Sequence, residues 1–255
     1  MRLFADVARS ELCKLLTVRS TYWTLGLAVM FNIGLAALLA IFLPDQLGAE
    51  DKATLDTTRV SLGGIHLSQV AFGVMGVLVI TSEYGTGSIR PSLSAVPRRR
   101  LLLAAKAAVF ATIALAVAGA SCFAAYLAFQ AAMSDELLRS DLADPGVVRA
   151  LVGGALFLAL LGLLGMGIGT IVRSSAGAIA GLMSLLFVPP VLLELLPPSW
   201  RTTIGPYVPM RAGSQIFSLH GETGALSAWA GLGVFGVYVT AALALAFVLI
   251  NRRDA

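Results

Sequence analysis

The chain has 255 residues, of which 58% are hydrophobic and only 13% are charged, and its mean hydropathy is +0.87. This composition excludes an ordinary water-soluble domain and indicates an all-α integral membrane protein. The formal net charge of +4 is compatible with a nucleic-acid partner, but the basic residues are scattered between apolar runs and form no aromatic and basic stripe. Nucleic acid is therefore not expected as a partner, whereas membrane lipid is.

The N-terminal segment, residues 1–21, has the pattern of an amphipathic helix. Its apolar residues gather on one side of a helical wheel, and the opposite side is polar. That polar side consists of Arg2, Asp6, Arg9, Ser10 and Cys13. The pattern predicts a helix that lies on the membrane surface and turns into the membrane near Thr21. Glu11 falls within the apolar arc. Either the helix frays there or the Glu11 side chain snorkels; the alternative is that Glu11 contacts a protein partner or a nearby basic residue.

Six apolar windows follow, each with about 20 residues or more, which is enough to cross roughly 30 Å of hydrocarbon. Backbone hydrogen bonding in lipid makes each window a helix. The windows are 23–43, 62–82, 107–130, 147–172, 176–196 and 228–250. The fourth contains the small-residue stretch GLLGMGIG, which permits close approach of another helix. We predict a single transmembrane domain over residues 1–255.

The charges of the connecting segments predict the orientation. Twelve of the 18 lysine and arginine residues fall on one side of the six windows, and the longer loops of the other side carry the other six together with many acidic residues. The positive-inside bias therefore places both termini, and the polar segment 83–100, in the cytoplasm.

Segment 83–100, between the second and third windows, is the most polar passage of the chain. Within it we predict a short helix over 89–96, capped by Ser88 and ended by Pro97. Its apolar side chains are Ile89, Leu93 and Val96. Such a helix fits a groove on a partner protein. The alternative is a juxtamembrane loop whose arginines only set the topology and contact anionic lipid.

The fifth window and the loop after it contain further unusual features. Pro189 and Pro190 are expected to kink the fifth helix. The connection 197–225 is long and partly apolar, so we expect part of it to re-enter or cap the bundle, the alternative being a floppy external loop. Glu194 is the main ionisable residue inside a window, and we expect it to face an aqueous vestibule or to pair with Arg201 rather than to shuttle protons.

The sequence lacks the motifs of common enzymes and metal sites. It contains no phosphate loop of the form G-x-x-x-x-G-K-[ST], no H-E-x-x-H, no C-x-x-C and no G-x-S-x-G. His66 and His220 have no ligand set around them, and Cys13 and Cys122 differ too much in depth to form a disulfide. We therefore expect no catalytic residue, no metal and no cofactor on this chain. A carrier driven by an ion gradient usually needs buried carboxylates near the midplane, and the windows have few.

Two stretches resemble a known family. SELCKLLTVRSTYWTL, residues 10–25, and ITSEYGTGSIRPSLSAVPRRRLLLAAK, residues 80–106, are similar to the elbow segment and to the segment after the second span in permease subunits of ABC transporters of the second, export class. The resemblance is to the short six-helix bacterial kind and covers about a sixth of the chain. Pro91 departs from it, because the family has Thr or Ser there.

The resemblance implies a role and a set of partners. The helix 89–96 would be a coupling helix seated on a separate cytoplasmic ATP-binding cassette ATPase, two of which serve two permease copies, in a homodimer or with a close paralogue. ATP and Mg²⁺ would bind the ATPase. The implied ATPase contacts are Glu83, Tyr84, Ile89, Arg90, Leu93, Arg98 and Arg99, with Glu11, Lys14 and Arg19 on the elbow.

The expected function is that of a bacterial cell-membrane exporter subunit for an amphiphilic or hydrophobic compound, such as a drug, a peptide or a lipid-like molecule. The family resemblance places the path between two copies, along the first, second and fifth spans. Its candidate polar residues are Asn32, Gln69 and Glu194. The alternatives are an ion-coupled secondary carrier and a non-transporting immunity or assembly protein.

Overall fold

The computed structural model describes residues 2–88, 91, 98–219 and 224–252. Within these ranges the regular structure is entirely helical, and six helices are long and apolar enough to cross a membrane. They are α2 (Arg19–Phe42), α5 (Ile65–Gly85), α7 (Arg99–Ala132), α8 (Val147–Val172), α9 (Ser175–Glu194) and α12 (Ala228–Arg252). The prediction of an all-helical, multi-pass membrane protein is confirmed.

Shorter helices precede and connect these six. The described ones are α1 (Arg2–Thr17), η1 (Pro44–Gln46), α3 (Ala49–Thr54), α4 (Thr57–Ser61), η2 (Glu136–Leu138), α10 (Pro198–Ile204), η3 (Gly205–Tyr207), α11 (Pro209–Ser214) and η4 (Gln215–Phe217). The predicted helix 89–96 lies outside the described residues, apart from Pro91. The third span differs most from its prediction, because α7 begins at Arg99, eight residues before the predicted window.

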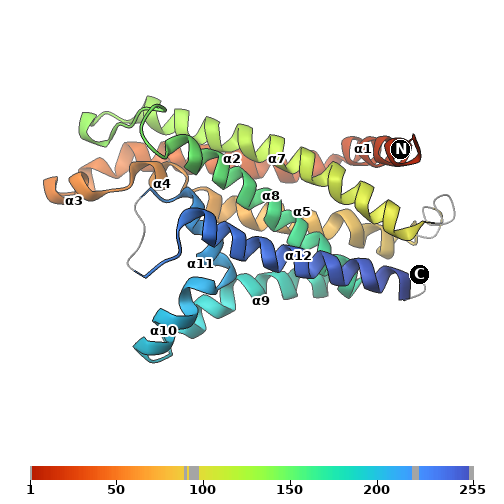
Figure 1. Ribbon diagram of the computed structural model, residues 1–255. Helices are drawn as coiled ribbons and strands as arrows, with labels where there is room; N and C mark the ends of the chain where they lie inside the picture. Colours follow the sequence, from red (N-terminus) through yellow and green to blue (C-terminus); the bar gives the residue numbers. More distant parts are fainter. Residues whose placement is uncertain (1, 89–90, 92–97, 220–223, 253–255) are drawn as a thin grey trace.

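Helix α8 forms the centre of the bundle and contacts α5, α7 and α12 (Figure 1). Its apolar window is 67% buried, compared with 22% for those of α9 and α12. Glycines permit the close contact between α5 and α8: a Cβ on Gly76 would lie 1.8 Å from the carbonyl oxygen of Gly162, and one on Gly165 would lie 2.3 Å from that of Gly73. The small residues expected to allow a close helix approach therefore meet within the chain.

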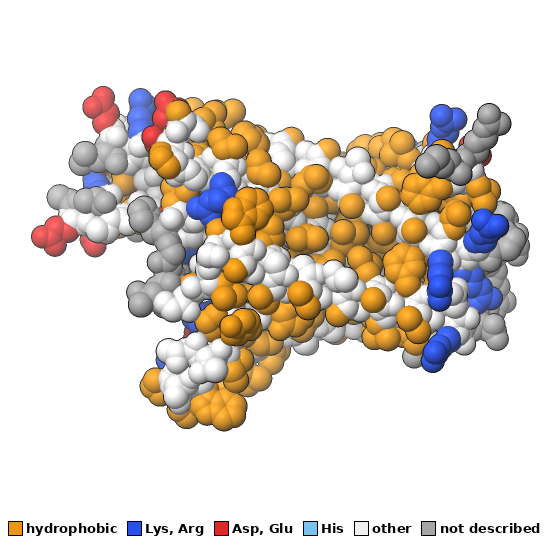
Figure 2. All heavy atoms as spheres, in the orientation of Figure 1, with side chains coloured by type: hydrophobic (Ala, Val, Ile, Leu, Met, Phe, Trp, Pro, Cys, Tyr) orange, Lys and Arg blue, Asp and Glu red, His pale blue; other side chains and the backbone are white. Residues whose placement is uncertain are grey.

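The two ends of the bundle differ in charge. Helix α1, the C-terminal ends of α5 and α12 and the N-terminal end of α7 lie at one end, which we name the terminal end (Figure 1). Figure 2 shows Lys and Arg side chains gathered at the terminal end, and acidic side chains together with some Lys and Arg at the opposite end. Among the described residues, the basic side chains predicted for one side of the membrane therefore gather at one end of the bundle.

The connection 197–225 is divided into two parts. Helix α10 has no buried residue and projects from the opposite end of the bundle (Figure 1). Helix α11 and η4 pack into the bundle, where Phe217 contacts Phe157, and Arg149 donates hydrogen bonds to the carbonyl oxygens of Ile216 and Ser218 at 3.2 and 3.0 Å. The second part therefore folds back against α8.

Candidate functional site

The candidate site lies at the terminal end, where α1 meets the ends of α5 and α7. Helix α1 attaches through its apolar side: Val7 is 6% exposed and packs on Leu102 and Ala105 of α7. The chain leaves helical geometry at Val18, where the backbone is extended, and α2 begins at the next residue. This packing turns Glu11, which falls within the apolar arc, and Lys14 toward the bundle.

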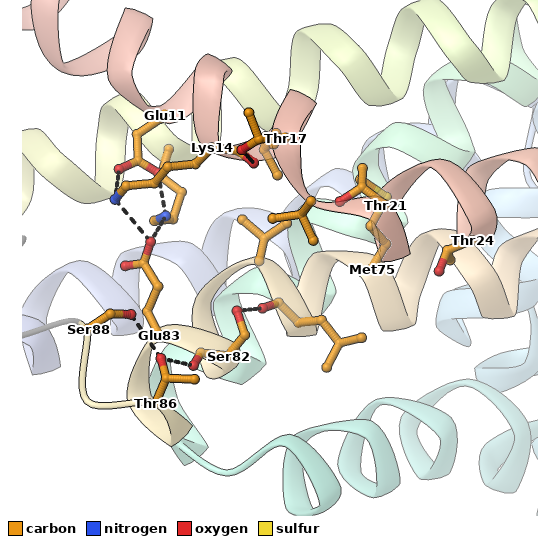
Figure 3. A pocket seen from close by; sticks show the side chains of 15 residues that line it. Glu11, Lys14, Thr17, Thr21, Thr24, Met75, Ser82, Glu83, Thr86 and Ser88 are labelled. Carbon is orange, nitrogen blue, oxygen red and sulfur yellow. Dashed lines mark hydrogen bonds and ion pairs between the residues drawn. The ribbon is translucent and has the colours of Figure 1, made fainter.

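Four charged side chains from three helices form the site (Figure 3), which we name the charge cluster. Its members are Glu11 and Lys14 of α1, Glu83 of α5 and Lys106 of α7. Lys14 Nζ lies 2.7 Å from Glu11 Oε1 and 3.2 Å from Glu83 Oε1. Lys106 Nζ donates to Glu11 Oε2 and, at 2.8 Å, to Glu83 Oε1. Each ammonium therefore bridges both carboxylates.

The charge cluster is largely withdrawn from water. Glu11 and Lys106 are each 2% exposed, and Glu83 is 9% exposed. Two carboxylates and two ammonium groups have no net charge, which offsets part of the cost of burying them. One atom stays unsatisfied: Glu83 Oε2 is buried and has no hydrogen-bond partner among the described residues.

The electrostatics of the two residues on α1 follow from this arrangement. Burial disfavours the charged form of Glu11, but the Lys106 ammonium, assisted by Lys14, outweighs burial and lowers the pKa of the Glu11 carboxyl. Burial likewise opposes the charge of Lys14, whereas its hydrogen bond to Glu11 and the charges of Glu83 and Glu11 raise its pKa. Both groups are therefore held in their charged forms at neutral pH.

The structure thus resolves the two interpretations of Glu11. Its side chain neither frays nor snorkels but points inward to basic residues of the same chain. Glu11 and Glu83 are predicted to contact an ATPase; within the chain both are buried and bind Lys14 and Lys106, and the ATPase contact stays a prediction. Lys106 is not among the predicted contact residues; in the sequence it is one of the twelve basic residues whose distribution predicts the orientation. A lysine followed by an unbroken apolar run was the signal that its charge needs a buried partner.

The other predicted contact residues surround the charge cluster or lie outside the described residues. Tyr84 lies under the guanidinium of Arg173, whose Cζ is 5.1 Å from the ring centroid. Arg99 donates to the carbonyl oxygen of Ile250 at 3.3 Å, while Arg98 and Arg19 are exposed. Outside the described residues are Ile89, Arg90 and Leu93.

The structure separates the residues proposed to line a path. Asn32 is buried and donates to Ser121 Oγ at 3.0 Å, and Gln69 is buried with no partner for its amide among the described residues. Glu194 is exposed at the end of α9. Arg201 Nη2 donates to the backbone carbonyl oxygen of Glu194 at 2.9 Å, and not to the Glu194 carboxylate. None of the three lines either of the two cavities described below.

A cavity of about 520 Å³ adjoins the charge cluster between α1, α2 and α5. Leu15, Met75 and Leu78 contribute apolar walls, and Thr21 and Thr24 add hydroxyl groups (Figure 3). Cavities of this size, mainly apolar with a few polar groups, are typical of sites for small molecules. The lining therefore suits an amphiphilic compound, with the polar groups concentrated at the terminal end.

Metal binding finds no support in the part of the chain that the structure describes, since no cluster of three or more His, Cys, Asp or Glu residues occurs there. A scan against models of known protein families finds no match, and a search of curated proteins finds none with significant similarity.

Proposed function

We propose that the chain is the permease subunit of an ATP-driven exporter of the second export class of ABC transporters, with ATP hydrolysed on a separate cytoplasmic ATPase. It would act with a second permease copy in a bacterial cell membrane, with the terminal end in the cytoplasm. The observation that supports this best is the charge cluster, because it joins α1 to the beginning of segment 83–100.

The charge cluster links the parts that a cytoplasmic partner would move. Helix α5 ends at Gly85, two residues after Glu83, and α7 begins at Arg99, seven residues before Lys106, so the two residues flank the connection between these helices. Glu83 binds Lys14 of α1, and Lys106 binds Glu11 of α1 as well as Glu83. The three helices therefore cannot separate at this end without breaking these ion pairs. A force on the segment would therefore move α1, α5 and α7 together.

This arrangement provides what a permease driven by another protein requires. The sequence has no phosphate-binding loop of its own. In the described spans the charged residues lie near the helix ends, as Glu83, Lys106, Arg149 and Glu194 do. An ion-coupled carrier is favoured by buried carboxylates near the midplane, so this distribution supports an external energy source instead.

The substrate class is inferred from the cavity beside the charge cluster. Its apolar walls lie on the spans α2 and α5, and its polar residues lie toward the terminal end. An amphiphile of the leaflet at that end would place its polar part against the hydroxyl and charged groups and its apolar part along Met75 and Leu78. The basic residues of the terminal end (Figure 2) support a cytoplasmic position for this end.

The experiment is a purification of the tagged chain from its native host in mild detergent, with mass spectrometry of the proteins that accompany it. We expect a stoichiometric ATP-binding cassette ATPase. Leu93→Asp, within segment 83–100, should abolish this association while membrane insertion is retained. Leu142→Asp is the matched control, because Leu142 is an exposed leucine in a loop at the opposite end.

Three outcomes would contradict the proposal. A chain that purifies alone, and whose transport continues after ATP depletion while a proton gradient remains, would be an ion-coupled carrier. Protection of cells that persists without any ATPase would identify an immunity or assembly protein. Undiminished association in Leu93→Asp would remove the coupling role from segment 83–100.

A further inference from the structure

A second cavity, of about 160 Å³, lies at the opposite end of the molecule, where the connection 197–225 folds back. Arg201 of α10 and Arg211 of α11 both line it, together with Gln215. The described lining includes no acidic residue. Guanidinium groups match the geometry of phosphate and carboxylate oxygens, so a small cavity with two of them suits an anion.

Arg201 is held in place by neutral acceptors. Its Nε donates to the carbonyl oxygen of Leu196 at 3.1 Å, and its Nη2 donates to that of Glu194 at 2.9 Å. These carbonyl oxygens at the end of α9 orient the guanidinium without neutralising its charge. The donors that they do not use remain for a ligand, since a guanidinium carries five N–H groups.

Arg211 is positioned by the packing of its own helix. Its neighbours Ala212 and Gly213 are buried, so the backbone of α11 is fixed against the bundle. A Cβ on Gly205 would lie 3.2 Å from Arg211 Nη1, which places the guanidinium against the backbone where α10 ends. Among the described residues, this guanidinium has no hydrogen-bond or ion-pair partner.

Other basic residues at the same end are already engaged. Lys52 Nζ lies 2.7 Å from Asp135 Oδ2, and the Arg149 guanidinium donates to the backbone carbonyl oxygens of Ile216 and Ser218. Lys52 is therefore paired with a carboxylate, whereas Arg201 and Arg211 have no acidic partner among the described residues.

The surroundings of the cavity are apolar and exposed. Leu195 is 80% exposed, Trp200 55% and Tyr207 52%, and all three lie in the segment that contains α10 or leads into it. Figure 2 shows hydrophobic side chains covering the lobe that α10 forms. Trp and Tyr are enriched at the level of lipid headgroups, and Leu195 extends the apolar surface toward α9. The cavity therefore lies at the boundary between membrane and water.

We propose that Arg201 and Arg211 form a binding site for the phosphate of an anionic phospholipid, whose acyl chains lie on the exposed apolar surface of α9 and α10. Phosphate accepts hydrogen bonds from both guanidinium groups, and the apolar surface distinguishes a lipid from a soluble anion. The inference depends neither on the proposed transport function nor on which side of the membrane this end faces.

The test measures lipid binding by native mass spectrometry of the full chain, with its partners if they copurify, in mild detergent. Phosphatidylglycerol and phosphatidylcholine are titrated separately. We expect preferential binding of phosphatidylglycerol, and roughly tenfold weaker binding after the double change Arg201→Gln and Arg211→Gln, since two charge-assisted hydrogen-bonding groups are lost. Arg252→Gln is the matched control, because Arg252 is an exposed arginine at the terminal end, and its binding should equal that of the parent.

Folding is checked by the protection of the buried Cys122 thiol, which should be the same in all three proteins. If the double variant loses protection, Arg211→Gln alone replaces it, because the Arg211 side chain makes no hydrogen bond to the described residues. Equal phosphatidylglycerol binding by a folded variant and the parent would overturn the proposal. Complete displacement of the lipid by inorganic phosphate at equal concentration would also overturn it, by identifying a soluble anion as the ligand.

Discussion

Replacing Lys106 by methionine removes the ammonium of the charge cluster and keeps most of the side-chain volume. Lys106 is 2% exposed and bonds both Glu11 and Glu83. Without it, both carboxylates keep only Lys14, whose side chain is 41% exposed. Loss of one member of a buried ion pair costs about 3–5 kcal/mol, and we expect about 3 kcal/mol because Lys14 remains.

Lys14→Met is the matched control, with the same substitution in the same cluster. Lys14 Nζ lies 2.7 Å from Glu11, but water competes at an exposed ammonium. Ion pairs of this kind contribute about 1 kcal/mol or less. The two substitutions therefore separate burial from proximity as the source of the stabilisation.

The expected result is detachment of α1 from the bundle, which thiol labelling can measure. Val7 is 6% exposed and packs on α7, so in Val7→Cys the new thiol reacts with a maleimide only when α1 lifts away. Cys13→Ser removes the exposed native thiol, and the buried Cys122 reports unfolding of the bundle itself. About 3 kcal/mol corresponds to roughly 100-fold faster labelling at position 7, compared with at most about fivefold for Lys14→Met.

If the thiol at position 7 is labelled no faster in Lys106→Met than in the parent protein, Lys106 does not hold α1 to the bundle. If Lys14→Met speeds labelling as much as Lys106→Met does, burial contributes nothing to the stabilisation. Faster labelling of Cys122 together with position 7 would show that the whole bundle opens, and the local attachment of α1 would not be the quantity measured.

Two further predictions concern pH and helix packing. The pKa of the Glu11 carboxyl is lowered in the folded protein, so the stabilisation that Glu11 gives to the attachment of α1 is complete above the ordinary value of 4.5 and is lost as the pH falls through the lowered value. Hydrogen exchange of α1, corrected for intrinsic rates, should therefore rise in acid. Glu11→Gln should remove that dependence, and a dependence that persists would assign it to another group. Gly76→Ala should destabilise the bundle by about 1–3 kcal/mol, because the new Cβ would lie 1.8 Å from the Gly162 carbonyl oxygen. Gly233→Ala, with nothing within 4 Å of its Cβ, is the control, and equal thermal stability of the two variants would contradict the close contact of α5 with α8.

The spans were predictable because hydropathy is a local property. The fourth window, 147–172, has the same bounds as α8, since its apolar run ends at charged or glycine residues on both sides. The third window, 107–130, begins eight residues after the start of α7. The window excludes Lys106 because that residue is charged, whereas α7 starts at Arg99 and contains Lys106, whose charge is compensated inside the protein.

The candidate site was only partly predictable. Glu11, Lys14 and Glu83 were selected through a family resemblance, as surface contacts, and Lys106 was not selected. The structure brings the four together at distances that no residue spacing indicates, since Glu11 and Lys106 are 95 residues apart. Asn32 and Gln69 were selected for their polarity, yet polarity in a span does not reveal whether a side chain faces a path or the bundle interior.

The sequence by itself determined that this is a helical membrane protein with six spans, because lipid demands long apolar segments and internally satisfied backbones. It also determined that basic residues would favour one end, since their distribution along the chain follows the order of the spans. Only the tertiary structure decided which charges meet, which glycines face α5 and where Arg201 and Arg211 line one cavity. Those facts depend on contacts between helices distant in the chain, and the packing of side chains, not local composition, sets them.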